Sequence, residues 1–140
     1  MRIAVCGSMA FAERMRETAA QLSLLGHVAL LPDAVEVLNP SETLEEVALR
    51  KAKYDLIRRH WAKIRDADAV LVLNYDKNGV AGYVGGNTFL EMGFAHVLRK
   101  PVFLLNPIPD LPYAAEMKAM RPAILNGDIH SLQSSRSSNS

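Results

Sequence analysis

A glycine-rich turn that runs into a helical pattern is the segment of this sequence with the most evident chemistry. Gly85 and Gly86 are followed by Asn87 and Thr88, and the carboxylate of Glu91 comes three residues later. Backbone N–H groups at a helix start favour an anion or a ribose oxygen, and glycines allow such a ligand to approach closely. The alternative is a flexible turn in which Thr88 and Glu91, at Thr-x-x-Glu spacing, form a capping box. The spacing by itself leaves both interpretations open.

Two further side chains carry groups that can react or move a proton. His60 shares one face of a predicted helix with Ile57, Trp61 and Ile64, so the pattern points it inward. A lone histidine on an apolar face is more often a core residue than a ligand. Cys6, at the end of a buried strand, is likewise typical of a small core residue rather than a nucleophile.

The sequence has no spacing that is typical of a metal site. His27 and His96 lack partners at metal-ligand spacing, and cysteines and histidines do not cluster along the chain. We therefore predict that the protein has no metal site and needs no cofactor.

Short apolar runs alternate with helical patterns along the chain. Strands are predicted at residues 2–6, 27–31, 68–74 and 102–105, with an edge strand near 123–125. Helices are predicted at 9–25, from cap candidates at 41–45 to about residue 65, at 87–98 and at 113–120. The four glycines of residues 75–86 indicate a loop. The buried stripe of the helix at 87–98 is predicted to be Leu90, Phe94, Val97 and Leu98.

This alternation predicts an α/β fold, a three-layer flavodoxin-like or Rossmann-like open parallel sheet of four or five strands with helices on both faces. Ligands of such sheets bind outside the carboxyl ends of the strands. The residues delivered to that edge are Gly7 and Ser8, Pro32 and Asp33, Asn74 to Asp76, and Asn106 and Pro107. We therefore expect the binding site at this edge, with Asn74 among the substrate-binding residues.

Composition limits the kind of partner. The 140 residues fit one domain, predicted at 1–130, followed by a serine-rich tail at 131–140 that we expect to be disordered. Sixteen basic and fifteen acidic residues leave a net charge of +1, which argues against a nucleic acid polymer or an anionic membrane as partner. The single cysteine, the short apolar runs and the lack of a signal-peptide pattern predict a cytoplasmic protein that binds a small molecule.

Three segments resemble the nucleoside 2-deoxyribosyltransferase-like superfamily, which includes deoxyribosyltransferases and nucleoside 5'-monophosphate N-glycoside hydrolases. They are Cys6-Gly7-Ser8-Met9, Ala67-Asp68-Ala69-Val70-Leu71-Val72, and the run from Gly86 through Glu91-Met92-Gly93-Phe94-Ala95 that closes on Lys100-Pro101. The resemblance implies that Glu91 is a nucleophile that attacks the anomeric carbon and forms a covalent glycosyl intermediate. It also implies that the protein is a homodimer or higher homo-oligomer.

By the same resemblance, the first loop and the glycine loop hold sugar and phosphate oxygens. These positions correspond to Gly7, Ser8, Gly85, Gly86, Asn87 and Thr88. From its position alone, Ser8 is equally well explained as a turn residue or a helix N-cap.

The chain departs from the family pattern at three positions. Where members carry an aspartate on the helix before the third strand, this chain has His60, which is a candidate general acid toward the leaving base. Gly85 and Gly86 stand where many members have an acidic residue or serine before the threonine. Ala10 stands where the phosphate-hydrolysing branch tends to place an arginine, so the need for a 5'-phosphate stays open.

Two alternative functions remain at this level. One is a phosphoribohydrolase of the lysine-decarboxylase-like, cytokinin-activating kind, whose Gly-Gly-x-Gly-Thr-x-x-Glu motif resembles residues 85–91 except at Asn87. The other is a non-catalytic nucleotide-binding or sensing module in which Glu91 only caps its helix. Turnover that depends on Glu91 distinguishes an enzyme from such a module.

Overall fold

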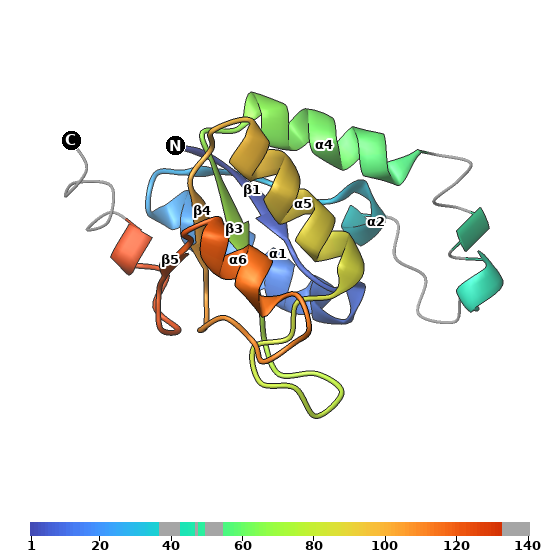
Figure 1. Ribbon diagram of the computed structural model, residues 1–140. Helices are drawn as coiled ribbons and strands as arrows, with labels where there is room; N and C mark the ends of the chain where they lie inside the picture. The colour runs from blue at the N-terminus through green and yellow to red at the C-terminus, as the bar shows by residue number, and fades with distance from the viewer. Residues whose placement is uncertain (37–42, 47, 50–54, 133–140) are drawn as a thin grey trace.

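A computed structural model of the chain describes residues 1–36, 43–46, 48–49 and 55–132. Its strands are β1 (Arg2–Cys6), β2 (Val28–Leu30), β3 (Ala69–Val72), β4 (Val102–Leu104) and β5 (Ala123–Ile124). They form one parallel sheet in the order β2-β1-β3-β4-β5 (Figure 1). This is the flavodoxin-like order, so the predicted fold class is confirmed.

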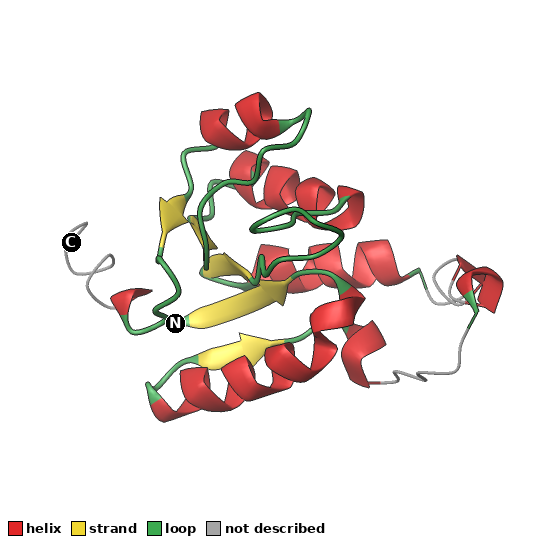
Figure 2. Cartoon of the chain, turned by 90° about the horizontal axis from the view of Figure 1, so that it is seen from below, coloured by secondary structure: helices red, strands yellow, loops and turns green. Residues whose placement is uncertain are grey.

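Helices cover both faces of the sheet (Figure 2). They are η1 (Met9–Phe11), α1 (Ala12–Leu24), α2 (Asp33–Glu36), α4 (Leu56–Asp66), α5 (Gly86–Val97) and α6 (Ala114–Ala119). The last part of the helix predicted at 41–65 is α4, and residues 41, 42, 47 and 50–54 of that prediction lie outside the described residues. Residues 133–140 of the predicted tail also lie outside them. None of the described helices combines the length and apolar character that a membrane crossing requires.

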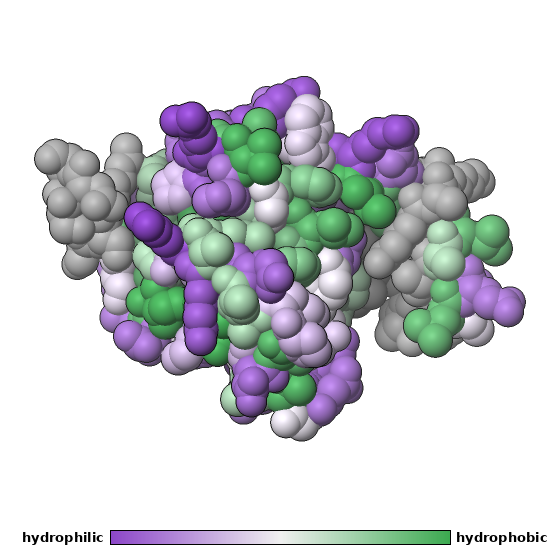
Figure 3. Space-filling view, viewed as in Figure 1, coloured by the Kyte–Doolittle hydropathy of each residue, from purple (hydrophilic) through white to green (hydrophobic). Residues whose placement is uncertain are grey.

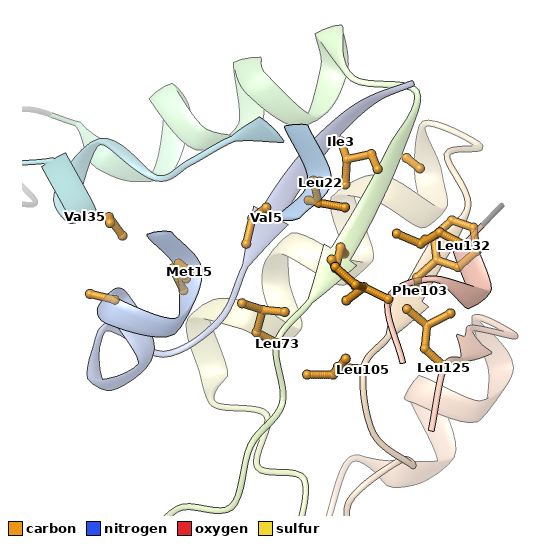
Figure 4. Packing of buried hydrophobic residues seen from close by; sticks show 14 residues of the cluster. Ile3, Val5, Met15, Leu22, Val35, Leu73, Phe103, Leu105, Leu125 and Leu132 are labelled. Carbon is orange, nitrogen blue, oxygen red and sulfur yellow. The ribbon is translucent and has the colours of Figure 1, made fainter. Parts of the chain in front are cut away.

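Alternation along β1 divides the core into two layers. Ile3 and Val5 pack with residues of α1 on one face of the sheet (Figure 4). Ala4 and Cys6 pack on the opposite face with residues of α4, α5 and α6. Because successive strand residues point to opposite faces, the side chain of Cys6 faces the same layer as α4 and α5.

The predicted buried stripe of α5 is wrong at two of its four positions, whereas Phe94 and Leu98 are partly buried against the core. The side chains of Leu90 and Val97 are 50% and 80% exposed, and the buried positions are instead Thr88, Glu91, Met92 and Ala95. Apolar residues lie around most of this helix, so their spacing does not identify the face that packs on the sheet. The outward apolar side chains line a groove, here called the α5 groove, with Trp61, Phe89, Leu90, Gly93, Phe94, Val97, Leu98 and Met120. Figure 3 shows apolar side chains gathered over α5 on this side.

Candidate active site

A narrow cleft lies at the carboxyl ends of β1 and β2, between these strands and helices α4 and α5. Its lining residues are Gly7, Met9, Pro32, Asp33, Leu56, Ile57, His60, Asn87 and Glu91. The cleft has a volume of about 30 Å³, which is room for about two water molecules. A sugar ring therefore enters only if the more exposed lining side chains, such as Leu56 and Ile57, move apart. The position agrees with the edge at which ligands of such sheets bind.

Glu91 lies in the second turn of α5 and its side chain reaches the cleft. Helix α5 begins at Gly86, its N-cap is Gly85, and that cap makes no side-chain hydrogen bond. Thr88 is therefore not the N-cap, and the capping box that its spacing to Glu91 allowed does not form. Glu91 is only 6% exposed, so its carboxylate is largely screened from water while it lines the cleft.

His60 of α4 is in contact with Glu91. Its Nε2 atom lies 3.4 Å from Oε2 of Glu91 and 3.3 Å from Sγ of Cys6. Burial lowers the pKa of His60 to about 4, and the charge of Lys63 contributes in the same direction. The imidazole is therefore neutral near pH 7. Its Nδ1 atom is buried and makes no hydrogen bond of normal length and angle within the described residues.

Cys6, at the end of β1, lies beneath the side chains of His60 and Glu91. Burial raises the pKa of the Cys6 thiol well above its ordinary value, and the negative charge of Glu91 and a hydrogen bond between the two side chains add to the effect. Cys6 is thus a neutral thiol in the apolar layer, as its position in the sequence predicts. The sequence did not indicate that it lies beside the two candidate catalytic residues.

Asp33 is a cleft residue that the motifs did not identify. It follows β2, and its carboxylate accepts hydrogen bonds from Lys63 and, at 3.4 Å, from Arg59. The hydrogen bond from Lys63 lowers the pKa of Asp33 below its ordinary value. The cleft therefore contains the ionised carboxylate of Asp33 as well as the side chain of Glu91, and the signal for Asp33 was its position directly after the second predicted strand.

Lys77 is the other residue that sequence reasoning missed. Its Nζ donates to Oγ of Ser8 at 2.8 Å, and the same oxygen accepts from the backbone N–H of Ala10 at 3.2 Å. Asn78 and Gly79, with φ of 53° and 74°, form the tight turn that returns the chain beside Lys77. Ser8 is thus a helix cap, and it also places the Lys77 ammonium next to the first loop.

Two of the predicted binding residues line the cleft and five do not. Gly7 and Asn87 are among its lining residues, together with both predicted catalytic residues. The other five are not, namely Ser8, Asn74, Gly85, Gly86 and Thr88. Gly86 is exposed at the first residue of α5, whereas Thr88 is buried against the core.

Asn74 has a structural task at the same edge of the sheet. Its Nδ2 donates to the carbonyl oxygens of Asn106 at 2.8 Å and Gly82 at 3.3 Å, and its Oδ1 accepts from the N–H of Asn106 at 2.9 Å. These bonds occupy both ends of the amide. Asn74 therefore ties the ends of β3 and β4 to the glycine-rich loop, and its predicted role in substrate binding stays a prediction.

Comparison with solved structures finds proteins of the same fold. A 2-deoxyribosyltransferase from Bacillus psychrosaccharolyticus has a TM-score of 0.55 at 19% identity, covering 76% of this chain and 73% of its own. A CMP N-glycosidase from Clostridium botulinum has a TM-score of 0.51 at 16% identity, covering 89% and 84%. A 2-deoxyribosyltransferase from Leishmania mexicana has a TM-score of 0.52 at 16% identity, covering 76% and 67%.

No protein-family model matches the sequence, and neither does any curated protein. At these identities the likeness concerns the fold. The chain thus has the flavodoxin-like fold of the 2-deoxyribosyltransferases and of a CMP N-glycosidase, in agreement with the resemblance of its motifs.

Proposed function

We propose that this protein cleaves or transfers the N-glycosidic bond of a nucleoside, deoxynucleoside or nucleoside 5'-monophosphate. The observation that carries the proposal is the placement of Glu91, a buried carboxylate at the floor of a cleft at the carboxyl edge of β1, in contact with His60. The two kinds of enzyme with the same fold act on such bonds, as their names state.

In the proposed reaction the Glu91 carboxylate attacks the anomeric carbon. The bond from that carbon to the base nitrogen breaks, its electron pair leaves with the base, and the base takes up a proton from solvent. The water or second base that attacks next gives up one proton in return. The resulting glycosyl ester of Glu91 is then resolved by water in a hydrolase, or by the nitrogen of a second base in a transferase. Either route regenerates the free carboxylate.

His60 is proposed to position the carboxylate. At a pKa of about 4 the imidazole is neutral under ordinary conditions, so a proton that it donates to the leaving base would come from the neutral ring. A neutral ring that presents Nε2–H can donate to Oε2 of Glu91 and hold the carboxylate in one orientation. The ionised carboxylate of Asp33 is a suitable acceptor for a sugar hydroxyl in the same cleft.

The Lys77 ammonium favours a substrate with a 5'-phosphate. Ser8, to which Lys77 donates, stands between Gly7 and Met9, and both of these line the cleft. A phosphate on the sugar can exchange with the serine hydroxyl as the partner of this cation and gain a charge-assisted hydrogen bond. Lys77 would then take the place of the arginine that the family motif has at position 10.

The test is release of free base by the wild-type protein and by Glu91→Gln. Both are incubated with a panel of nucleosides and 5'-monophosphates, with and without a second base, and the products are separated by chromatography. We expect Glu91→Gln to lose at least about 10³-fold in rate, as removal of a nucleophile does, while substrate binding measured by calorimetry persists. Glu116→Gln, an exposed carboxylate on α6, is the matched control.

The same panel separates the alternatives. A new nucleoside in the two-base samples identifies a transferase, and base release with water alone identifies a hydrolase. A phosphoribohydrolase would accept only 5'-monophosphates with ribose. Binding without turnover in both proteins would indicate a sensing module and contradict the proposal.

A further inference from the structure

Three side chains of different chemistry meet below the cleft. The Sγ atom of Cys6, a ring nitrogen of His60 and a carboxylate oxygen of Glu91 all lie within 4.8 Å of one another. They come from β1, α4 and α5, and each of the three residues is buried. Thiolate, imidazole and carboxylate are the three ligand types that proteins use for zinc.

Two of the three spacings between these atoms are close to the edges of a zinc tetrahedron, and the third is within 4.8 Å. With Zn–S near 2.3 Å and Zn–N or Zn–O near 2.0–2.2 Å, ligand atoms at tetrahedral angles are separated by roughly 3.3 to 3.6 Å. The Cys6 Sγ to His60 Nε2 distance is 3.3 Å, and the His60 Nε2 to Glu91 Oε2 distance is 3.4 Å. An ion can therefore be placed between the three side chains with little rearrangement.

Charge also suits a divalent cation. In the tautomer that carries its proton on Nδ1, the His60 ring presents a lone pair at Nε2 to the ion. Binding replaces the thiol proton of Cys6, which leaves as H⁺, and the resulting thiolate and the Glu91 carboxylate together carry the two negative charges that balance Zn²⁺. Magnesium and calcium prefer sets of oxygen ligands, so a sulfur and a nitrogen select against them.

The cleft provides access and an open coordination position. His60 and Glu91 both line it, as does Gly7, the neighbour of Cys6. Three protein ligands with a fourth position open to a cleft is the arrangement of exchangeable zinc sites, whereas structural sites are closed by four protein ligands.

We propose that Cys6, His60 and Glu91 form a binding site for a thiophilic divalent cation such as Zn²⁺, and that the bound cation blocks glycoside chemistry. The bound cation prevents the reaction because the Glu91 carboxylate oxygen that must attack the anomeric carbon becomes a metal ligand. The metal site stands independently of the proposed function, and only the block depends on it. This proposal departs from the metal-free protein that the sequence predicts, because 54 residues separate Cys6 from His60 and no motif spacing connects them.

The experiment is a Co²⁺ titration of the full chain, without a polyhistidine tag, followed by displacement with Zn²⁺. Cys6 is the only cysteine of the sequence, so a thiolate-to-cobalt charge-transfer band can arise from no other residue. We expect this band to appear at one equivalent of Co²⁺ and to disappear with one equivalent of Zn²⁺.

Variants test each ligand. Cys6→Ala and Cys6→Ser should both lack the band. Two different replacements are used so that the test can still be made if one of the variants does not fold. Glu91→Gln should lower the affinity for Co²⁺ at least about 100-fold, because even outer-shell changes reduce metal affinity 10–100-fold. His96→Ala and His130→Ala, at exposed positions, should bind as the wild type does.

Absence of the band in wild-type protein overturns the proposal. The proposal also fails if Co²⁺ binding is lost in the two exposed-histidine controls but kept in Glu91→Gln. Base release with and without one equivalent of Zn²⁺ then tests the block. Undiminished base release by the Zn²⁺-loaded protein contradicts the block alone. If no substrate is cleaved in the absence of metal, the proposed function fails, while the cobalt spectrum still decides the metal site.

Discussion

The contact between Glu91 and His60 places two ionisable groups in a nearly dry environment. Each is less than a tenth exposed. Burial, together with the charge of Lys63, lowers the pKa of His60 and outweighs the attraction of the Asp33 carboxylate. A buried neutral histidine has a consequence for stability that can be measured without any substrate.

Stability should fall as the pH drops from 6.5 toward 4, in part because of His60. Its pKa is about 4 in the folded chain and 6.5 ordinarily, so in this window the unfolded chain binds more protons and acid favours unfolding. Between neutral pH and pH 4, the wild-type free energy of unfolding should fall by about 3 kcal/mol more than that of His60→Gln. Urea unfolding at a series of pH values measures this difference.

The exposed His96→Gln is the control for that series and should follow the wild-type curve. If the free energy of unfolding of wild type and of His60→Gln changed in parallel with pH, His60 would be protonated equally in the folded and unfolded chains, contrary to the expectation.

Lys77→Gln should weaken the binding of a phosphorylated substrate more than that of an unphosphorylated one. Loss of a charge-assisted hydrogen bond, worth about 1.5–3 kcal/mol, should raise KM for a nucleoside 5'-monophosphate about 10- to 100-fold. The KM for the corresponding nucleoside should change much less, because it has no charged group for Lys77 to bind. Steady-state kinetics with the matched pair of substrates measures the effect.

Lys118→Gln removes an exposed lysine from α6 and serves as the charge control for this comparison. An equal rise in KM for both substrates would argue that Lys77 only supports the first loop.

At the scale of elements, the glycine-rich loop is held to the sheet by close packing. Gly82 has φ of 65°, and a Cβ atom there would lie 2.8 Å from the carbonyl oxygen of Pro107. Its N–H donates to Asp76, and its carbonyl accepts from Asn74. The loop that precedes α5 therefore depends on a glycine at this position, for both its backbone conformation and the space available.

Gly82→Ala should destabilise the protein by about 1–3 kcal/mol, from left-handed strain and the clash with Pro107. Gly86→Ala, where a Cβ meets nothing within 4 Å, should change stability by less than about 1 kcal/mol. Thermal unfolding of the two variants beside wild type measures both. Similar melting temperatures for Gly82→Ala and wild type would mean that the loop relaxes without loss of its contacts.

At the scale of the whole molecule, the α5 groove is an apolar surface that water contacts in the single chain (Figure 3). Contiguous apolar patches on a protein surface are typical of interaction sites. The net charge of +1 opposes association of two copies only weakly. Since the same helix carries Glu91, we expect a second copy of this chain to cover the groove, in line with the homo-oligomer that the family resemblance implies.

Val97→Glu should weaken this self-association at least about 100-fold, because the interface would bury an unpaired charge. Val97 is 80% exposed and lies in the groove. Leu24→Glu alters an equally exposed apolar residue of α1, on the other face of the sheet, and should leave association unchanged. Sedimentation equilibrium over a range of concentrations measures both. A monomeric wild-type protein would rule out this use of the groove.

Local patterns predicted most of the elements and the edge of the sheet at which the site lies. The apolar run at 69–72 is buried throughout, as expected of a central parallel strand, and the residues after β1 and β2 line the cleft. These features depend on the order of apolar and polar residues over a few neighbouring positions, and this order can be read from the sequence. The glycine turn drew attention to Glu91, and the family resemblance supplied its role as nucleophile, which stays a prediction.

Only the tertiary structure decided what surrounds that carboxylate. The packing of α4 against α5 over the end of β1 brings Cys6, His60 and Glu91 within 4.8 Å of one another, and residues far apart in the chain carry no mutual spacing that a motif can show. The same holds for the contact of Lys77 with Ser8. The face of α5 that is buried was likewise set by the layer beneath it, because a helix with apolar residues on most sides has no single stripe to read.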